Sequence, residues 1–259
     1  MEDSRAIEAA AVIWENWCGN SRIAALPETC RPHSIPQGYA AQDALVDLSG
    51  WTPVGWKIAA TSEAGQKHIN VDGPLAGRLL DGKLYANGDA LPVRHLHMSV
   101  VEAEFVFRLG EDLPPRECEY LPEDVVEATV ALHLGIEVPD SRFEDFTKVG
   151  AAQLIADNAC TEFFAIGEEV TEAWRELDLS AHKVSLAING EQAAEGTGAN
   201  VLGDPRRALA WLANDRIVHG GALQAGEIVT TGTCIVPARI APGDDVVADF
   251  GVLGNISLH

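Results

Sequence analysis

Residues 101–107 are the stretch that most constrains the fold of this chain. They read Val-Glu-Ala-Glu-Phe-Val-Phe, and β-branched and aromatic residues with apolar side chains at alternate positions predict a β-strand. Side chains alternate between the two faces of a strand, so Glu102, Glu104 and Val106 are expected on one face. Two carboxylates this close raise each other's pKa unless a cation lies between them. The pair therefore indicates a site for a hard divalent ion such as Mg²⁺ or Mn²⁺, and the alternative is a solvated strand face.

The acidic composition argues against several classes of partner. The 259 residues include 18 Lys+Arg and 39 Asp+Glu, which gives a formal net charge of −21. Nucleic acids and anionic membrane surfaces both require clustered basic residues, so neither is an expected partner. No segment approaches the roughly 20 apolar residues of a membrane span, and the first residues do not resemble a signal peptide. We therefore expect a soluble cytoplasmic protein.

Helix and strand patterns follow one another along the chain. Helical spacing and terminal residues predict helices over 4–17, 40–48, 123–132 and 206–214, and proline and glycine predict a loop over 71–81. Asn189-Gly190 predicts the turn of a β-hairpin that begins with strand 184–188. The C-terminal part is expected to be mostly β, with strands at 227–231, 234–237, 245–250 and 254–258.

Three further positions carry candidate site residues. Lys57 interrupts the apolar strand 55–60, either as an edge residue whose amine reaches water or as a buried amine with a function. Glu137 lies in a short strand that a proline ends, and is either a third metal ligand or a simple strand-end residue. Asp157 and Asn158 end an apolar segment, where such residues form an Asx turn or present their side chains to a site.

Several short motifs follow one another over nearly the whole chain. They include GWKI at 55–58, EAE at 102–104, GIEVPDSR at 135–142, ADNA at 156–159 and AGEIVTTG at 225–232. Together they resemble the 2-keto-4-pentenoate hydratase and 4-oxalocrotonate decarboxylase group of the fumarylacetoacetate hydrolase superfamily. The resemblance implies an α+β fold, with a small helical N-terminal portion (1–52) before a mixed-β, barrel-like core (53–259).

The resemblance also implies an activity and a set of site residues. The activity is that of a metal-dependent hydratase, which adds water to a 2-hydroxy-2,4-dienoate and gives a 4-hydroxy-2-oxo acid in the catabolism of aromatic compounds. The implied ligands of Mg²⁺ or Mn²⁺ are Glu102, Glu104 and Glu137, and the implied catalytic residues are Lys57 and Asp157. The residues expected to bind the substrate are Thr61, Ser62, Leu75, Arg142, Asn158 and Thr231. The resemblance further implies a homo-oligomer that can associate with a sister decarboxylase or hydratase.

Leu75 departs from the hydratase pattern. Hydratases of this group carry an acidic residue after the proline of segment 71–77, and it is thought to take part in proton transfer. An apolar residue at this position is more like the decarboxylase branch. A decarboxylase of a 2-oxo-3-enedioate is therefore the second interpretation, and a non-catalytic partner subunit of such enzymes is the third.

Overall fold

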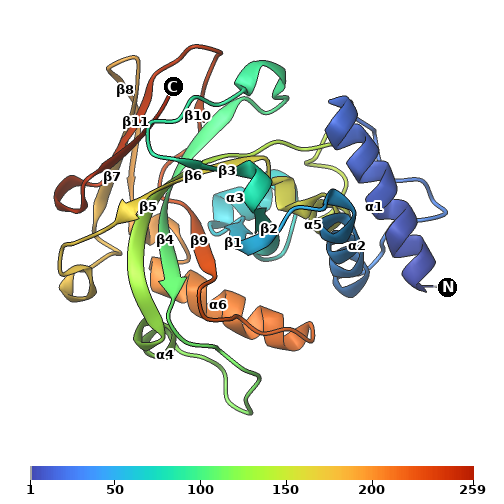
Figure 1. Cartoon of the computed structure of the whole chain (residues 1–259), viewed down its shortest axis with the longest axis horizontal. Coiled ribbons are helices and arrows are strands. Elements are labelled where there is room, and N and C mark those ends of the chain that lie inside the picture. Colours follow the sequence, from blue (N-terminus) through green and yellow to red (C-terminus); the bar gives the residue numbers. More distant parts are fainter. Residues whose placement is uncertain (1) are drawn as a thin grey trace.

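A curled mixed sheet forms the centre of the molecule, with helices packed around it (Figure 1). The computed structural model describes residues 2–259. The strands of the larger sheet are β1 (Pro53–Ala59), β2 (Leu75–Leu80), β3 (Leu84–Ala86), β4 (Val100–Leu109), β5 (Thr129–Val138), β6 (Phe163–Glu169), β9 (Ile228–Thr233) and β10 (Ala238–Arg239). Their order is β2-β1-β9-β4-β5-β6-β3, and β10 pairs with β4. The expected α+β class and barrel-like core are confirmed.

Within residues 2–259, a smaller sheet and six α-helices complete the fold. The smaller sheet has the order β12-β11-β7-β8 and consists of β7 (Lys183–Ile188), β8 (Glu191–Thr197), β11 (Val246–Asp249) and β12 (Asn255–Leu258). The helices are α1 (Glu2–Gly19), α2 (Ile35–Ser49), α3 (Glu63–Ile69), α4 (Pro122–Glu127), α5 (Ala151–Ala156) and α6 (Pro205–Val218). None of the helices within residues 2–259 is both long and apolar enough to cross a bilayer.

The larger sheet curls until its first and last strands approach each other. β2 and β3 are at opposite ends of the strand order, yet only the short 3₁₀ turn Asp81–Lys83 separates them in the sequence. Because the four Cα–Cα steps from Leu80 to Leu84 reach at most about 14 Å, the end of β2 and the start of β3 have to lie close together. Inside the curl, Leu79, Val106, Phe164 and Ile228 form a small apolar cluster. This cluster fills the interior below the mouth at which β4 begins and β5 ends.

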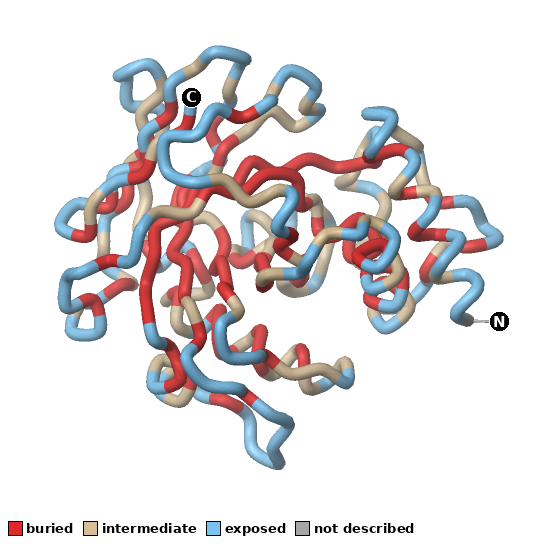
Figure 2. Tube along the Cα trace, viewed as in Figure 1, coloured by how far each residue is buried: buried red, intermediate tan, exposed pale blue. Residues whose placement is uncertain are grey.

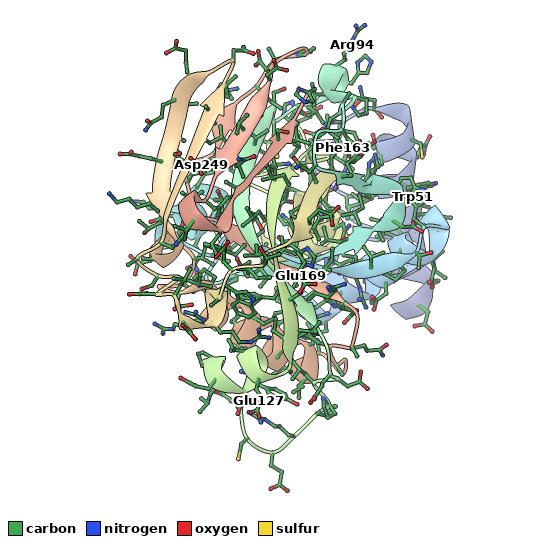
Figure 3. The ribbon with its side chains drawn as sticks, turned by 60° about the vertical axis from the view of Figure 1, so that its left-hand side comes forward. Trp51, Arg94, Glu127, Phe163, Glu169 and Asp249 are labelled. Carbon is green, nitrogen blue, oxygen red and sulfur yellow. The ribbon has the colours of Figure 1, made fainter. Side chains whose placement is uncertain are left out.

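The outer face of the larger sheet carries the main hydrophobic core. Phe105 and Phe107 point outward, and Phe105 packs edge-on against Phe250 with ring centroids 5.2 Å apart. Figure 2 shows that β4 and β5 are buried along most of their length, whereas the loops at the periphery are exposed. Figure 3 places the smaller sheet, which carries Asp249, on one side and Trp51 with the N-terminal helices on the other.

The N-terminal helices have an apolar cluster of their own. α1 and α2 pack on each other through residues such as Ile13 and Leu45. The same cluster includes Leu80, Phe143 and Ala156, which follow residue 52. The helical portion is thus packed onto the rest of the chain, and the division at residue 52 stays a prediction.

Several boundaries differ from those that the sequence predicts. The expected loop 71–81 contains strand β2, because Leu75–Leu80 pairs antiparallel with β1 despite its flanking glycines and proline. The expected helix 123–132 ends at Glu127, and the residues from Thr129 onward join β5, because pairing with β4 outweighs the local helical pattern. The apolar segment that Asp157 and Asn158 end forms helix α5.

The other predicted elements agree with the structure in part, and capping residues and turns explain where they begin and end. α2 begins at Ile35 rather than residue 40, because Ser34 caps its N-terminus and the proline that suggests a loop lies in its first turn. The expected strand 234–237 is mostly irregular, and the pairing occurs at β10. The Asn189-Gly190 hairpin between β7 and β8 is confirmed, and α6 begins after the capping residue Asp204.

A test of the curl is to fill the space beside Gly135. A methyl group there would lie 2.3 Å from Phe164 Cζ and 2.8 Å from Val106 Cγ2. We expect Gly135→Ala to lower the free energy of unfolding by about 1–3 kcal/mol, as measured by urea denaturation. Gly73→Ala is the matched control, because its added methyl meets open space, and it should stabilise by less than about 1 kcal/mol. Equal unfolding midpoints for the two variants would contradict this packing.

Candidate active site

Three glutamates converge at one mouth of the curled sheet. The antiparallel register of β4 and β5 places Glu102 directly opposite Glu137, and Glu104 is the next residue of β4 on the same face. One carboxylate oxygen from each of the three lies within 4.8 Å of the others. Glu104 and Glu137 are buried and Glu102 is partly buried. The solvated-face alternative for this pair therefore does not describe the structure.

Lys57 faces the same cluster from β1. This strand lies between β2 and β9, so Lys57 is not an edge residue, and it is only 2% exposed. Its Nζ lies 2.9 Å from Glu137 Oε1 and donates a hydrogen bond to the Ala159 carbonyl at 2.8 Å. Burial alone lowers the pKa of the Lys57 amine, but the Glu137 and Glu102 carboxylates outweigh it and the net pKa is raised. Lys57 is thus a buried ammonium group held among carboxylates.

The acidic cluster is electrostatically incomplete by itself. Three carboxylates and one ammonium have a net charge of −2 when all are ionised, in a place that is largely shielded from water. Burial, with the Glu137 carboxylate, raises the pKa of Glu102 to about 7 and that of Glu104 well above its usual range. Within residues 2–259, Glu104 Oε1 and Glu137 Oε2 are buried without a hydrogen-bond donor. Acceptor oxygens and a charge deficit of two fit a hard divalent cation.

Strand β9 fixes the orientation of Glu104. The Thr230 hydroxyl and the Gly232 N–H, at 2.9 Å, both donate to Oε2, which leaves Oε1 for the centre of the cluster. Thr231, which the sequence analysis assigns to substrate binding, instead donates its hydroxyl to the Phe105 carbonyl at 3.1 Å. The period of two along β9 identifies Thr230 once its pairing with β4 is known, because Thr230 lies opposite Val106 on the glutamate face.

A left-handed turn brings a backbone carbonyl to Lys57. Asn158, Ala159 and Cys160 have φ values of 50°, 49° and 62°, three consecutive non-glycine residues in the left-handed region. That conformation costs about 1–2 kcal/mol per residue. Backbone strain of this kind persists only where surrounding contacts enforce it, and it concentrates at functional sites. Here the turn aims the Ala159 oxygen at the Lys57 ammonium.

Strand β2 and Asn158 hold this turn. The Asn158 side chain pairs with the backbone of Arg78, accepting from its N–H at 2.6 Å and donating to its carbonyl at 2.9 Å. Gly77 is required beside it, because a Cβ there would lie 2.4 Å from the Asn158 carbonyl oxygen. One N–H and one oxygen lone pair of the Asn158 amide are therefore engaged by the scaffold, and its role in substrate binding stays a prediction.

Asp157 anchors the same turn through Arg142. Its carboxylate accepts from the Ser141 hydroxyl at 2.7 Å, from the Arg142 N–H at 3.0 Å and from Arg142 Nε. Asp157 and Arg142 are both almost completely buried. Both carboxylate oxygens are engaged by Ser141 and Arg142, an arrangement that positions the turn, and the catalytic role expected for Asp157 stays a prediction.

The other residues assigned to substrate binding line or support the region of Lys57. Thr61 is buried against Gly232, where a Cβ would lie 2.1 Å from Thr61 Oγ1. Ser62 caps α3 by accepting from the Gly65 N–H at 3.0 Å. Leu75 is buried at the start of β2, opposite Ala59. Contact of these side chains with a substrate stays a prediction.

Comparison with known protein families identifies the family to which this fold and acidic cluster belong. Residues 83–258 match the model described as the fumarylacetoacetate (FAA) hydrolase C-terminal domain. The chain belongs to the fumarylacetoacetate hydrolase family. Within that family it belongs to the 2-keto-4-pentenoate hydratase and 4-oxalocrotonate decarboxylase group, as the following similarities establish.

Curated relatives and a solved structure match over nearly the full length. A 2-keto-4-pentenoate hydratase of Burkholderia vietnamiensis is 34% identical over 260 residues, covering 99% of this chain and 98% of that protein. A 4-oxalocrotonate decarboxylase of a Pseudomonas species is 31% identical over 210 residues, covering 80% and 78%. The structure of 4-oxalocrotonate decarboxylase from Pseudomonas putida G7, complexed with magnesium and adipate, superposes with a TM-score of 0.89 at 27% identity, covering 99% and 97%.

The scaffold role of Asp157 is testable by comparing two ion pairs. Asp157→Asn leaves the buried Arg142 guanidinium without its carboxylate, and we expect it to lower the free energy of unfolding by about 3–5 kcal/mol. Glu169→Gln removes the exposed pair with Arg108 and should change it by less than about 1 kcal/mol. Chemical denaturation measures both. If Asp157→Asn were as stable as Glu169→Gln, the anchoring role would be wrong.

Proposed function

We propose that this protein is a metal-dependent hydratase, which adds water to a 2-hydroxy-2,4-dienoate and gives a 4-hydroxy-2-oxo acid in the catabolism of aromatic compounds. The observation that carries the proposal is the buried cluster of three carboxylates around Lys57. Full-length similarity to the Burkholderia hydratase supports the same reaction. The magnesium in the decarboxylase structure supports a divalent ion as the cofactor, Mg²⁺ or Mn²⁺.

Glu102, Glu104 and Glu137 would hold the cation. Their two orphaned oxygens and net charge of −2 with Lys57 are the features that suit it. When bound, such an ion supplies Lewis-acid stabilisation of negative charge on an oxygen of the substrate. The donors from Thr230 and Gly232 fix one oxygen of Glu104 and keep the other directed at the cluster.

Lys57 is the group of this chain best placed to act on the substrate. Its ammonium is held by the Ala159 carbonyl and by Glu137, which leaves a remaining N–H for a substrate oxygen. In that position it would bind the carboxylate of the oxo acid or transfer a proton at Nζ. The apolar cluster below, including Val106 and Phe164, keeps water from entering through the interior of the curl.

Decarboxylation of a 2-oxo-3-enedioate is the second candidate. Leu75 favours it, because an apolar side chain does not repel a departing carboxylate, and it stands where hydratases of the group carry an acidic residue. The high structural similarity to the decarboxylase supports it as well. Both reactions use the same acidic cluster and Lys57, so they differ in what surrounds the far end of the substrate.

A direct assay distinguishes these activities. We expect the protein with Mg²⁺ to remove the ultraviolet absorbance of 2-hydroxypenta-2,4-dienoate, and EDTA to abolish this loss. Glu104→Gln should lower turnover by at least about 100-fold, since it removes a charged ligand, whereas Glu191→Gln on the exposed smaller sheet should have no effect. CO₂ release from 2-oxohex-3-enedioate without hydration would instead identify the decarboxylase. Metal binding with neither reaction would identify a non-catalytic partner.

Metal binding should depend on pH through Glu102. Burial and the Glu137 carboxylate raise the pKa of Glu102 to about 7, and a proton has to leave before a cation can bind. Below that pH, we therefore expect Mn²⁺ affinity to fall by at least about tenfold per pH unit, because the pKa of Glu104 is raised as well, as followed by the electron paramagnetic resonance of free Mn²⁺. Glu102→Gln should bind more weakly and with a shallower pH dependence. An affinity that does not change between about pH 5 and about pH 7 would contradict the assignment.

A further inference from the structure

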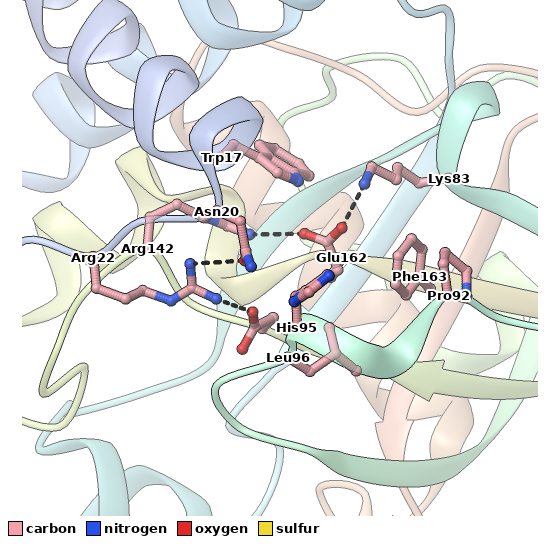
Figure 4. A pocket seen from close by; sticks show the side chains of 11 residues that line it. Trp17, Asn20, Arg22, Lys83, Pro92, His95, Leu96, Arg142, Glu162 and Phe163 are labelled. Carbon is pink, nitrogen blue, oxygen red and sulfur yellow. Dashed lines mark hydrogen bonds and ion pairs between the residues drawn. The ribbon is translucent and has the colours of Figure 1, made fainter. Parts of the chain in front are cut away.

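A cavity lined by both charged and apolar side chains lies outside the curled sheet, beside the end of α1 (Figure 4). Its volume is about 160 Å³, and Trp17, Lys83 and Phe163 are among the residues that line it. Phe163 precedes Phe164 of the interior cluster, so the two side chains point to opposite faces of β6. None of the three glutamates of the acidic cluster lines this cavity, nor does Lys57. It is therefore a separate site.

The charges around the cavity balance. Its lining includes the cations Arg22, Lys83 and Arg142 and the carboxylates of Asp140 and Glu162. Arg142 also pairs with the buried Asp157 carboxylate, so three cations meet three carboxylates. The cavity therefore has no excess of negative charge that would repel an anion, although the chain has a formal net charge of −21.

The lining carboxylates are fully engaged. Glu162 pairs with Lys83 through Oε1 and with Arg142, at 3.5 Å, through Oε2. Asp140 pairs with Arg22 through Oδ2 and accepts two backbone N–H groups, at 2.9 Å each, through Oδ1. The carboxylates therefore have little remaining capacity for a ligand's donors.

The unused hydrogen-bonding capacity belongs to donors. Trp17 is only 9% exposed, and its indole Nε1 is buried without an acceptor anywhere in residues 2–259. Figure 4 shows this nitrogen on the edge of the ring that faces Glu162 and Lys83. The Lys83 Nζ lies 5.4 Å from the centre of the Trp17 ring and has N–H groups beyond the one that pairs with Glu162. One pair of ligand oxygens can thus accept from both residues.

The remaining walls are apolar. Phe163, Leu96 and Pro92 contribute hydrocarbon surface, and the Lys83 ammonium lies 4.6 Å from the centre of the Phe163 ring. Since a water takes about 30 Å³ in the liquid, the cavity accommodates a molecule several times that size. We propose that it binds a short-chain organic monocarboxylate, with the carboxylate on Trp17 Nε1 and Lys83 Nζ and the hydrocarbon chain against Phe163.

Nuclear magnetic resonance of the indole N–H groups tests this site directly. The protein is labelled with ¹⁵N-tryptophan, kept in EDTA so that the acidic cluster holds no metal, and titrated with butyrate. We expect the Trp17 indole resonance, assigned by its loss in Trp17→Phe, to shift and saturate. Butanol, which has the same chain without the charge, should not shift it, and inorganic phosphate should shift it less. An equal response to phosphate would overturn the carboxylate assignment, and no saturating response to butyrate would overturn the site.

Calorimetric titration of variants with butyrate tests the two donors. Trp17→Phe and Lys83→Met should each weaken binding by about tenfold, the effect of one lost hydrogen bond to a charged group. Trp14→Phe is the matched control, because its ring packs 6.0 Å from that of Trp17 but does not line the cavity. It should bind like the original protein. Unchanged affinity in both Trp17→Phe and Lys83→Met, or an equal loss in Trp14→Phe, would overturn the assignment, and circular dichroism identifies any variant that fails to fold.

Discussion

The antiparallel register between β4 and β5 is the constraint on which the acidic cluster depends. It sets Glu102 against Glu137 and leaves Glu104 on the same face, so three carboxylates from distant parts of the sequence share one mouth of the sheet. A slip of one residue would turn Glu137 to the outer face, into the main core. Gly135 is compatible with this register because it has no side chain. The Phe164 and Val106 side chains occupy the space that a larger residue at this position would need.

The surroundings of Lys57 show how the fold maintains a costly arrangement. Three left-handed residues and a buried ammonium are both unfavourable alone, and each is stabilised by the other through the Ala159 carbonyl. Behind the turn, Asp157 and Arg142 form a buried ion pair that anchors its first residue. The buried polar residues near the site thus form two groups. Lys57 faces the acidic cluster, whereas Asp157, Arg142 and Asn158 hold the turn that contacts Lys57.

The sequence predicts the parts of this site that depend on local residue patterns. It does not predict the parts whose positions depend on pairing between strands that are distant in the sequence. Alternation along 101–107 is sufficient to place Glu102 and Glu104 together, and the Asn189-Gly190 turn is sufficient for its hairpin. Glu137 can be assigned to the cluster only by resemblance, because its partner lies 35 residues earlier in the chain (137 − 102 = 35). The contact of Thr230 with Glu104 and the strand β2 escape prediction for one reason, since both depend on pairing with strands that local patterns do not reveal.

The turn around Asn158 has a consequence for the behaviour of the protein at high concentration. An open sheet ends in rows of unpaired backbone groups, and such rows recruit strands from other molecules. β2 is the first strand in the order of the larger sheet, and the Asn158 side chain occupies both the N–H and the carbonyl of Arg78 in this strand. The turn that supports Lys57 thereby also blocks part of an edge at which another molecule could pair, which works against aggregation.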